Sequence, residues 1–168
     1  MSFVCSYCGK RHDDELPALA FMQPDYWLTL SDAQRAEGSL TADDCVTPDG
    51  HFFIRCSLEL PIRDRAGQKL TFGVWSTLSE ENYNRYADAF FDEDQSKIGS
   101  MFGWFSNEMG GNFRPTLNLK CHVRPQDHRQ RPLIELEQSD HLLAVAQREG
   151  IWFAHVERLL HESGAYET

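Results

Sequence analysis

The chain has 168 residues, 41% of them hydrophobic and 25% charged, and this balance argues against a disordered chain or a long coiled coil. It carries 26 acidic and 16 basic side chains, and the formal net charge of −10 argues against nucleic acid as a partner. The sequence has no secretory signal and no apolar run of roughly 20 residues, so we expect a cytoplasmic protein without a membrane partner.

A chain of this length fits one domain, and we expect residues 1–168 to form it without internal repeats. Residues 1–48 contain many turn-forming residues and little periodicity, which predicts a zinc knuckle followed by an irregular segment. One short helix is expected at 31–37, where Ser31 can cap the first turn. Residues 49–168 are expected to form an antiparallel sheet with helices packed on it.

Residues 51–60 and 70–78 alternate between apolar and polar side chains, which is the period of half-buried strands. The turn-forming residues at 63–67 lie between them, so the two strands are expected to pair as an antiparallel hairpin. Further strands are expected at 101–105, 116–123 and 133–137. The first of these lies in a loop-rich stretch of glycine, asparagine and aromatic residues.

Helices are predicted after the hairpin and again at the end of the chain. Ser79 followed by two glutamates is typical of a helix start, and apolar residues then recur at helical spacing as far as Phe91. Ser139 or Asp140 can cap another helix that Gly150 ends, and 151–161 carries a second apolar stripe. Hairpins followed by separate helices predict an α+β fold with a mostly antiparallel sheet of about four to five strands.

The N-terminus carries the motif Cys5-x-x-Cys8-Gly9, with His12 close behind. Two cysteines at this spacing reach one zinc ion from a tight turn, and thiolate and imidazole are the ligands that zinc prefers. Cys45 is our expected fourth ligand because its neighbours are polar turn residues. His51, Asp13 and Asp14 remain alternatives. Four protein ligands would make the zinc site structural.

Other roles for the cysteine pair stay open. A redox-active pair would be expected at the start of a helix within a βαβ unit, which this segment lacks, and two idle thiols are also compatible with the sequence. Cys56 and Cys121 fall on the apolar faces of predicted strands, so we expect both to be core residues.

No catalytic motif is recognisable, so no catalytic residue is nominated. Polar residues on the strands could form an ordinary solvated sheet face. Alternatively, they could line a ligand-binding face together with the aromatic loop. The candidate residues for that face are Arg55, Glu59, Trp75, Trp104, Asn107, Lys120 and His122.

Short segments along nearly the whole chain resemble a bacterial family, domain of unknown function 2199. They are Cys5–His12, Pro24–Trp27, Asp44–Val46, Phe53–Arg55, Leu58–Pro61, Gly73–Trp75, Phe102–Trp104, Thr116–Lys120, Arg131-Pro132 and Asp140-His141. The resemblance implies a four-ligand metal set at Cys5, Cys8, His12 and Cys45. It implies no activity, and Leu142 departs from the family pattern, which has proline there.

From these observations we expect a zinc-stabilised binding or interaction module without catalysis, whose partner is an unidentified protein or small molecule. One alternative is a hydrolase-like enzyme that uses an open metal position or the polar sheet face. Another is an immunity-type protein whose acidic surface neutralises a basic partner.

Overall fold

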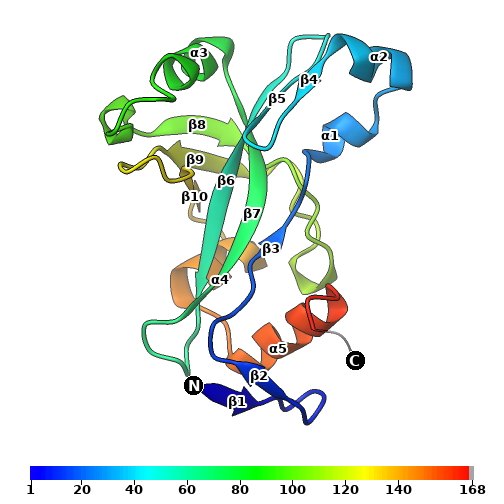
Figure 1. Ribbon diagram of the computed structural model, residues 1–168, viewed down its shortest axis with the longest axis vertical. Coiled ribbons are helices and arrows are strands. Elements are labelled where there is room, and N and C mark those ends of the chain that lie inside the picture. The colour runs from blue at the N-terminus through cyan, green and yellow to red at the C-terminus, as the bar shows by residue number, and fades with distance from the viewer. Residues whose placement is uncertain (167–168) are drawn as a thin grey trace.

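The computed structural model describes residues 1–166, which form a mixed α+β fold around one curved sheet (Figure 1). The strands are β1 (Ser2–Val4), β2 (Arg11–Asp13), β3 (Leu19–Ala20), β4 (Ser39–Leu40), β5 (Asp44–Val46), β6 (Phe52–Pro61), β7 (Lys69–Leu78), β8 (Met101–Trp104), β9 (Lys120–Arg124) and β10 (Leu133–Leu136). The helices are α1 (Asp25–Leu28), α2 (Asp32–Glu37), α3 (Glu80–Asp88), α4 (Leu142–Glu149) and α5 (Phe153–Glu162), with short 3-10 turns at Ser96–Ile98 and Gly111–Phe113.

The predicted hairpin is the longest pairing in the sheet. Strands β6 and β7 are antiparallel, in register from Phe52 opposite Leu78 to Pro61 opposite Lys69. Ile54, Cys56, Leu58 and Leu60 alternate into the main core, as the sequence period requires. The predicted hairpin is therefore confirmed.

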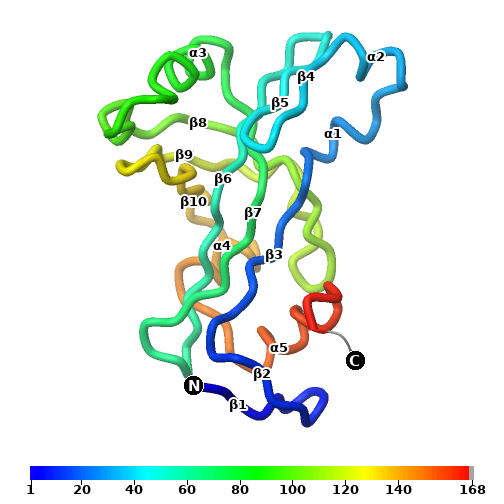
Figure 2. The backbone as a smooth tube through the Cα atoms, in the orientation of Figure 1, coloured from blue at the N-terminus to red at the C-terminus, as the bar shows by residue number. Residues whose placement is uncertain are grey.

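The sheet itself corrects the prediction of four to five mostly antiparallel strands. Within residues 1–166 it has eight strands and is mixed, because β10 runs parallel to β6 and β3 runs parallel to β7. Three of the eight strands, β3, β4 and β5, come from the segment predicted to be irregular. Figure 2 shows the N-terminal segment running alongside β7 as β3 before it reaches α1. Strands of two or three residues are too short to produce a detectable period.

The sheet curls so that its last strand returns to β7. An isolated bridge joins Phe105, just after β8, to Ser76, and the Ser106 amide donates to the Trp75 carbonyl at 2.9 Å. Gly103 makes this approach possible, because a Cβ there would overlap the Thr77 carbonyl oxygen and the Ser76 hydroxyl. The curl brings the aromatic loop after β8 against the hairpin.

Two hydrophobic clusters lie on opposite faces of the hairpin. The larger contains the inward residues of β6 and β7 together with the buried faces of α4 and α5. The smaller consists of Cys45, Phe53 and Trp75, covered by partly buried aromatic residues of α1 such as Tyr26. Among the helices of residues 1–166, none combines the length and the apolar character that a membrane crossing requires.

The predicted helices are present, with differences at their ends. Ser31 and Ser79 cap α2 and α3 through their side chains, as expected. His141, rather than Ser139 or Asp140, caps α4, since its ring accepts from the Leu143 amide at 3.1 Å. Helix α3 ends at Asp88, which leaves Phe91 beyond it and largely exposed.

The strand predicted at 116–123 begins only at Lys120. Residues before it form a turn, in which the Leu119 amide donates to the Thr116 carbonyl at 3.2 Å and Asn118 has a left-handed φ of 66°. Asparagine tolerates that conformation better than most residues. The alternation of Leu117 and Leu119 therefore belongs to a turn and not to the strand.

Gly103→Ala is expected to reduce the free energy of unfolding by about 2 kcal/mol or more, because the added methyl group must force β8 away from β7. Gly67→Ala is the matched control. Gly67 has a φ of +77° in open space, so its substitution introduces backbone strain of about 1 kcal/mol without a clash. Chemical denaturation of both variants measures the difference. Equal losses would show that β8 does not need the close approach.

Candidate metal centre

A two-stranded hairpin at the N-terminus carries the first three candidate ligands. Strands β1 and β2 pair with Phe3 opposite His12, and the Cys5 amide donates to the Lys10 carbonyl at 2.9 Å. Within the turn, the Gly9 amide donates to the Cys5 carbonyl at 2.9 Å, and Gly9 has a φ of +73°. Glycine adopts this left-handed conformation without strain. The turn thus brings Cys5, Cys8 and His12 to one side.

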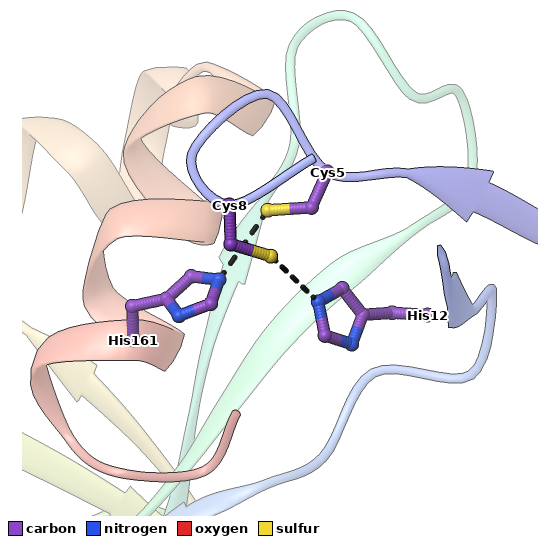
Figure 3. Close-up of side chains that lie close together, drawn as sticks. All are labelled: Cys5, Cys8, His12 and His161. Carbon is purple, nitrogen blue, oxygen red and sulfur yellow. Dashed lines mark hydrogen bonds between the residues drawn. The ribbon is translucent and has the colours of Figure 1, made fainter. Parts of the chain in front are cut away.

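Helix α5 supplies a fourth candidate, His161. One ligand atom from each of Cys5, Cys8, His12 and His161 lies within 4.8 Å of the other three (Figure 3). The Cys5 Sγ lies 3.3 Å from His161 Nε2, and the Cys8 Sγ lies 3.3 Å from His12 Nε2. In a tetrahedral zinc site with ordinary bond lengths, sulfur and nitrogen ligands are about 3.6 Å apart. The donor set and its spacing therefore fit a single tetrahedral ion.

Aromatic side chains hold the two imidazole rings. Tyr7 stacks on His161 with ring centroids 4.6 Å apart, and Tyr166 stacks on His12 at 3.8 Å. Cys5 and His161 are buried, whereas Cys8 and His12 are half-buried. The group therefore sits at the edge of the core, with its inner half screened from water.

Glu157 connects the knuckle directly to α5. Its side chain is only 3% exposed, and it accepts a hydrogen bond from the Ser6 amide at 3.1 Å and another from the Ser6 hydroxyl. Glu157 and His161 are four residues apart, so they project from the same face of α5. One helix face thus both contacts the backbone of the Cys-x-x-Cys turn and supplies His161 to the candidate ligand group.

The turn between β6 and β7 braces both parts of the site. The Arg65 guanidinium lies over the Phe153 ring of α5 at 3.8 Å and the Phe3 ring of β1 at 5.2 Å. The Asp64 carboxylate accepts from the Phe153 amide at 2.8 Å, which satisfies a donor in the first turn of α5. The hairpin therefore positions α5 and β1 relative to each other.

His161 takes the place that sequence analysis gave to Cys45. Cys45 lies in β5, fully buried between Phe53 and Trp75 in the smaller core. Burial, with a further contribution from Asp44, raises the pKa of the Cys45 thiol to about 12, so it stays protonated. The polar neighbours that suggested a loop belong to a short strand paired with β6. The alternatives His51, Asp13 and Asp14 are also outside the metal-binding group.

The sequence does contain a pattern that singles out His161. Predicted helix 151–161 has an apolar stripe, and Glu157 and His161 lie along its buried side at helical spacing. A buried carboxylate needs hydrogen-bond donors, so this pair indicates a polar partner packed on the helix. Sequence alone does not show that the partner is a segment 156 residues away.

The candidate ligand-binding face does not assemble as one surface. Trp75 is fully buried, and its indole nitrogen donates to the Phe21 carbonyl at 2.9 Å. Arg55 is buried opposite Trp75 in the register of β6 and β7. Glu59 lies further along β6, where it pairs with Lys69 at 2.7 Å. Trp75 and Arg55 therefore belong to the interior, whereas Glu59 is half-buried and forms a surface ion pair.

Asn107 is a buried structural brace. Its side chain accepts from the Trp75 amide at 2.8 Å and donates to the Gln23 carbonyl at 2.9 Å and the Asp25 carboxylate at 3.2 Å. These bonds fasten the segment before α1 to β7 and to the loop after β8. Asn107 therefore shapes this region without being accessible to a ligand itself.

Three of the seven candidates do share an exposed face. Trp104 lies opposite Lys120 in the pairing of β8 with β9, and His122 occupies the same face two residues further along. His122 pairs with Glu137 at 3.3 Å, and Trp104 remains 41% exposed. The His122–Glu137 contact is typical of a solvated sheet face, whereas a partly exposed indole is unlike the buried indole of Trp75.

Cys56 and Cys121 are buried core residues, as predicted. Burial raises the pKa of Cys56 well above its ordinary value and that of Cys121 to about 12. Within residues 1–166, neither thiol lies in the candidate ligand group of Cys5, Cys8, His12 and His161. These two residues are therefore packing groups rather than ligands.

Residues 4–151 match the model of the family DUF2199, described as an uncharacterized protein conserved in bacteria. The chain belongs to this family. No curated protein and no solved structure matches it. Cys5, Cys8 and His12 lie inside the matched span of the family model, whereas His161 lies beyond its end.

Glu157→Ala is expected to lower the free energy of unfolding by about 1–3 kcal/mol, because two hydrogen bonds from exposed Ser6 to the buried carboxylate are lost. Glu162→Ala is the matched control on the same helix, since Glu162 is exposed and pairs with Arg158 at 3.8 Å. Denaturant unfolding gives the two free energies, and hydrogen exchange of the Ser6 amide reports the contact directly. Unchanged protection of Ser6 in Glu157→Ala would contradict the assigned role.

Proposed function

We propose that Cys5, Cys8, His12 and His161 bind one structural zinc ion in a non-catalytic binding module. The observation that carries the zinc proposal is the donor set itself, two cysteines and two histidines whose ligand atoms lie within 4.8 Å of one another. Calcium and magnesium need oxygen ligands, whereas sulfur and nitrogen donors in this arrangement favour zinc. Two thiolates would also neutralise the charge of the ion.

The zinc is proposed to be structural because four protein ligands fill a tetrahedral shell. No position then remains for a metal-bound water, which a hydrolytic zinc site requires. The four ligands join a knuckle at one end of the chain to a helix at the other, since His161 lies 156 positions after Cys5 in the sequence. Closing so long a loop removes conformational entropy from the unfolded chain, so the ion would stabilise the folded state.

The binding part of the proposal is supported by a pocket at the opposite end of the β6–β7 hairpin. It has a volume of about 310 Å³ and lies between α1 and the sheet, with Trp104 in its lining. Volumes of this order suit small ligands. A small molecule is therefore the partner that we propose, in preference to a protein.

We expect the purified protein to contain one zinc ion per chain, measured by elemental analysis of untagged protein prepared without chelator. Cys8→Ser and His161→Ala each remove one ligand and should reduce the zinc content strongly. Cys45→Ala is the matched control, because it also removes a buried thiol but leaves the ligand group intact.

Retention of full zinc by His161→Ala, or its loss from Cys45→Ala alone, would contradict the assigned ligand set. Protein without zinc would contradict the metal proposal as a whole. A melting curve for each variant separates loss of metal from loss of fold.

Chelation is expected to lower the melting temperature of the wild-type protein by several degrees, since a ligand that binds only the folded state stabilises it. Hydrogen exchange should rise mainly in β1, β2 and α5, whereas the amides of the β6–β7 hairpin keep their protection. His161→Ala provides the comparison, because chelator should shift its melting temperature little further. A uniform rise across the sheet would contradict a local tie.

A further inference from the structure

The pocket under α1 is built on three neighbouring strand positions. Phe53 faces Thr77 in the register of β6 and β7, and the Trp104 amide of β8 donates to the Thr77 hydroxyl at 2.9 Å. Asp25 and Tyr26 of α1 form part of the lining on the helix side. The return of β8 to β7 is therefore what brings the Trp104 side chain to this pocket.

Aromatic rings form much of its surface. The rings of Tyr26 and His51 meet at 4.6 Å and 67°, and the rings of Tyr26 and Phe53 are 6.2 Å apart. Tyr26, His51, Phe53 and Trp104 are all lining residues of the pocket. Trp104 is 41% exposed, in contrast to the fully buried Trp75. Aromatic faces around a cavity attract cations through the quadrupole of each ring.

The hydrogen-bonding groups of the lining are largely occupied by the protein. The two Asp25 oxygens accept from the Asn107 side chain at 3.2 Å and the Glu108 amide at 2.7 Å. The Ser106 hydroxyl donates to the Trp104 carbonyl at 2.7 Å, and the Thr29 hydroxyl likewise donates to a backbone carbonyl. A ligand with several N–H or O–H donors would find few partners here, which favours an apolar group.

The charges around the pocket are negative. Asp25 lines it, and Asp49 lies directly behind the rings, where it accepts a hydrogen bond from the Tyr26 hydroxyl and lies 3.5 Å from His51 Nε2. Hydrogen bonds from Thr47 and Tyr26 lower the pKa of Asp49, so its carboxylate is ionised at neutral pH. Among the described residues 1–166, no lysine or arginine lines this pocket.

We propose that the pocket formed by Tyr26, His51, Phe53 and Trp104 binds the quaternary ammonium group of a small organic molecule. A quaternary ammonium group is a cation without N–H donors, so it matches the aromatic walls, the nearby carboxylates and the scarcity of free hydrogen-bonding groups. This inference rests on the proposed binding role but not on the zinc ion, because the metal-binding group shares no residue with the pocket.

Choline and 3,3-dimethylbutan-1-ol are the probes, since they have the same shape and differ in the charge of one atom. Titration followed by heteronuclear NMR should show choline binding at the Trp104 indole about five- to thirty-fold more tightly than its neutral isostere. Ethanolamine, a primary ammonium ion with N–H donors, should also bind more weakly than choline. Equal binding of choline and the isostere would overturn the inference.

Trp104→Leu keeps an apolar side chain but removes the indole face, and it should weaken choline binding about five-fold or more. Trp152→Leu is the matched control, because Trp152 is also exposed, at 57%, and lies outside the pocket. Zinc content is measured on the same samples. If choline does not bind to protein that contains zinc, this inference alone is overturned. If choline binds to protein that contains no zinc, only the zinc proposal is overturned.

Discussion

The contact between the N-terminal knuckle and α5 joins the two ends of the chain. A two-stranded hairpin such as β1–β2 is marginally stable by itself, and it forms a sheet separate from the main one. Its fixed position therefore depends on contacts to α5, through His161 to the cysteine pair and through Glu157 to Ser6. Helix α5 packs on the core through its own apolar face, so the knuckle is tied to the core through α5.

The β6–β7 hairpin is the frame on which both ends of the molecule depend. A ten-residue strand spans about 33 Å, which is long enough to carry a different site at each end. Its turn holds α5 and β1 through Arg65, and its opposite end supplies Phe53 and Thr77 to the pocket. Figure 1 shows the knuckle and α1 at opposite ends of this hairpin. The cysteine–histidine group and the pocket are thus separated in space but share one rigid element.

The parts of the fold that follow from local sequence were predictable. The hairpin shows a long period-two pattern, Ser31 and Ser79 are standard caps, and Cys56 and Cys121 fall on apolar strand faces. Strands β3, β4 and β5 could not be predicted, because they are two or three residues long and exist only through pairing with the hairpin. Parallel pairing in particular has no local signal, since it joins segments distant in the sequence.

The candidate metal site likewise has a part that local sequence predicts and a part that depends on packing between distant segments. Cys5, Cys8 and His12 lie within one turn and its flanking strands, so spacing alone identifies them as a group, whereas the fourth position depends on how α5 packs. The polar neighbours of Cys45 were misleading because β5 is a strand of the sheet, and the Cys45 side chain lies in the smaller core.

The two tryptophan residues on strands show the same dependence on packing. Trp75 and Trp104 both lie on strands, yet Trp75 is buried in the smaller core and Trp104 lies partly exposed at a pocket. An exposed indole beside occupied hydrogen-bonding groups is therefore better evidence for a binding site than any residue type read from the sequence.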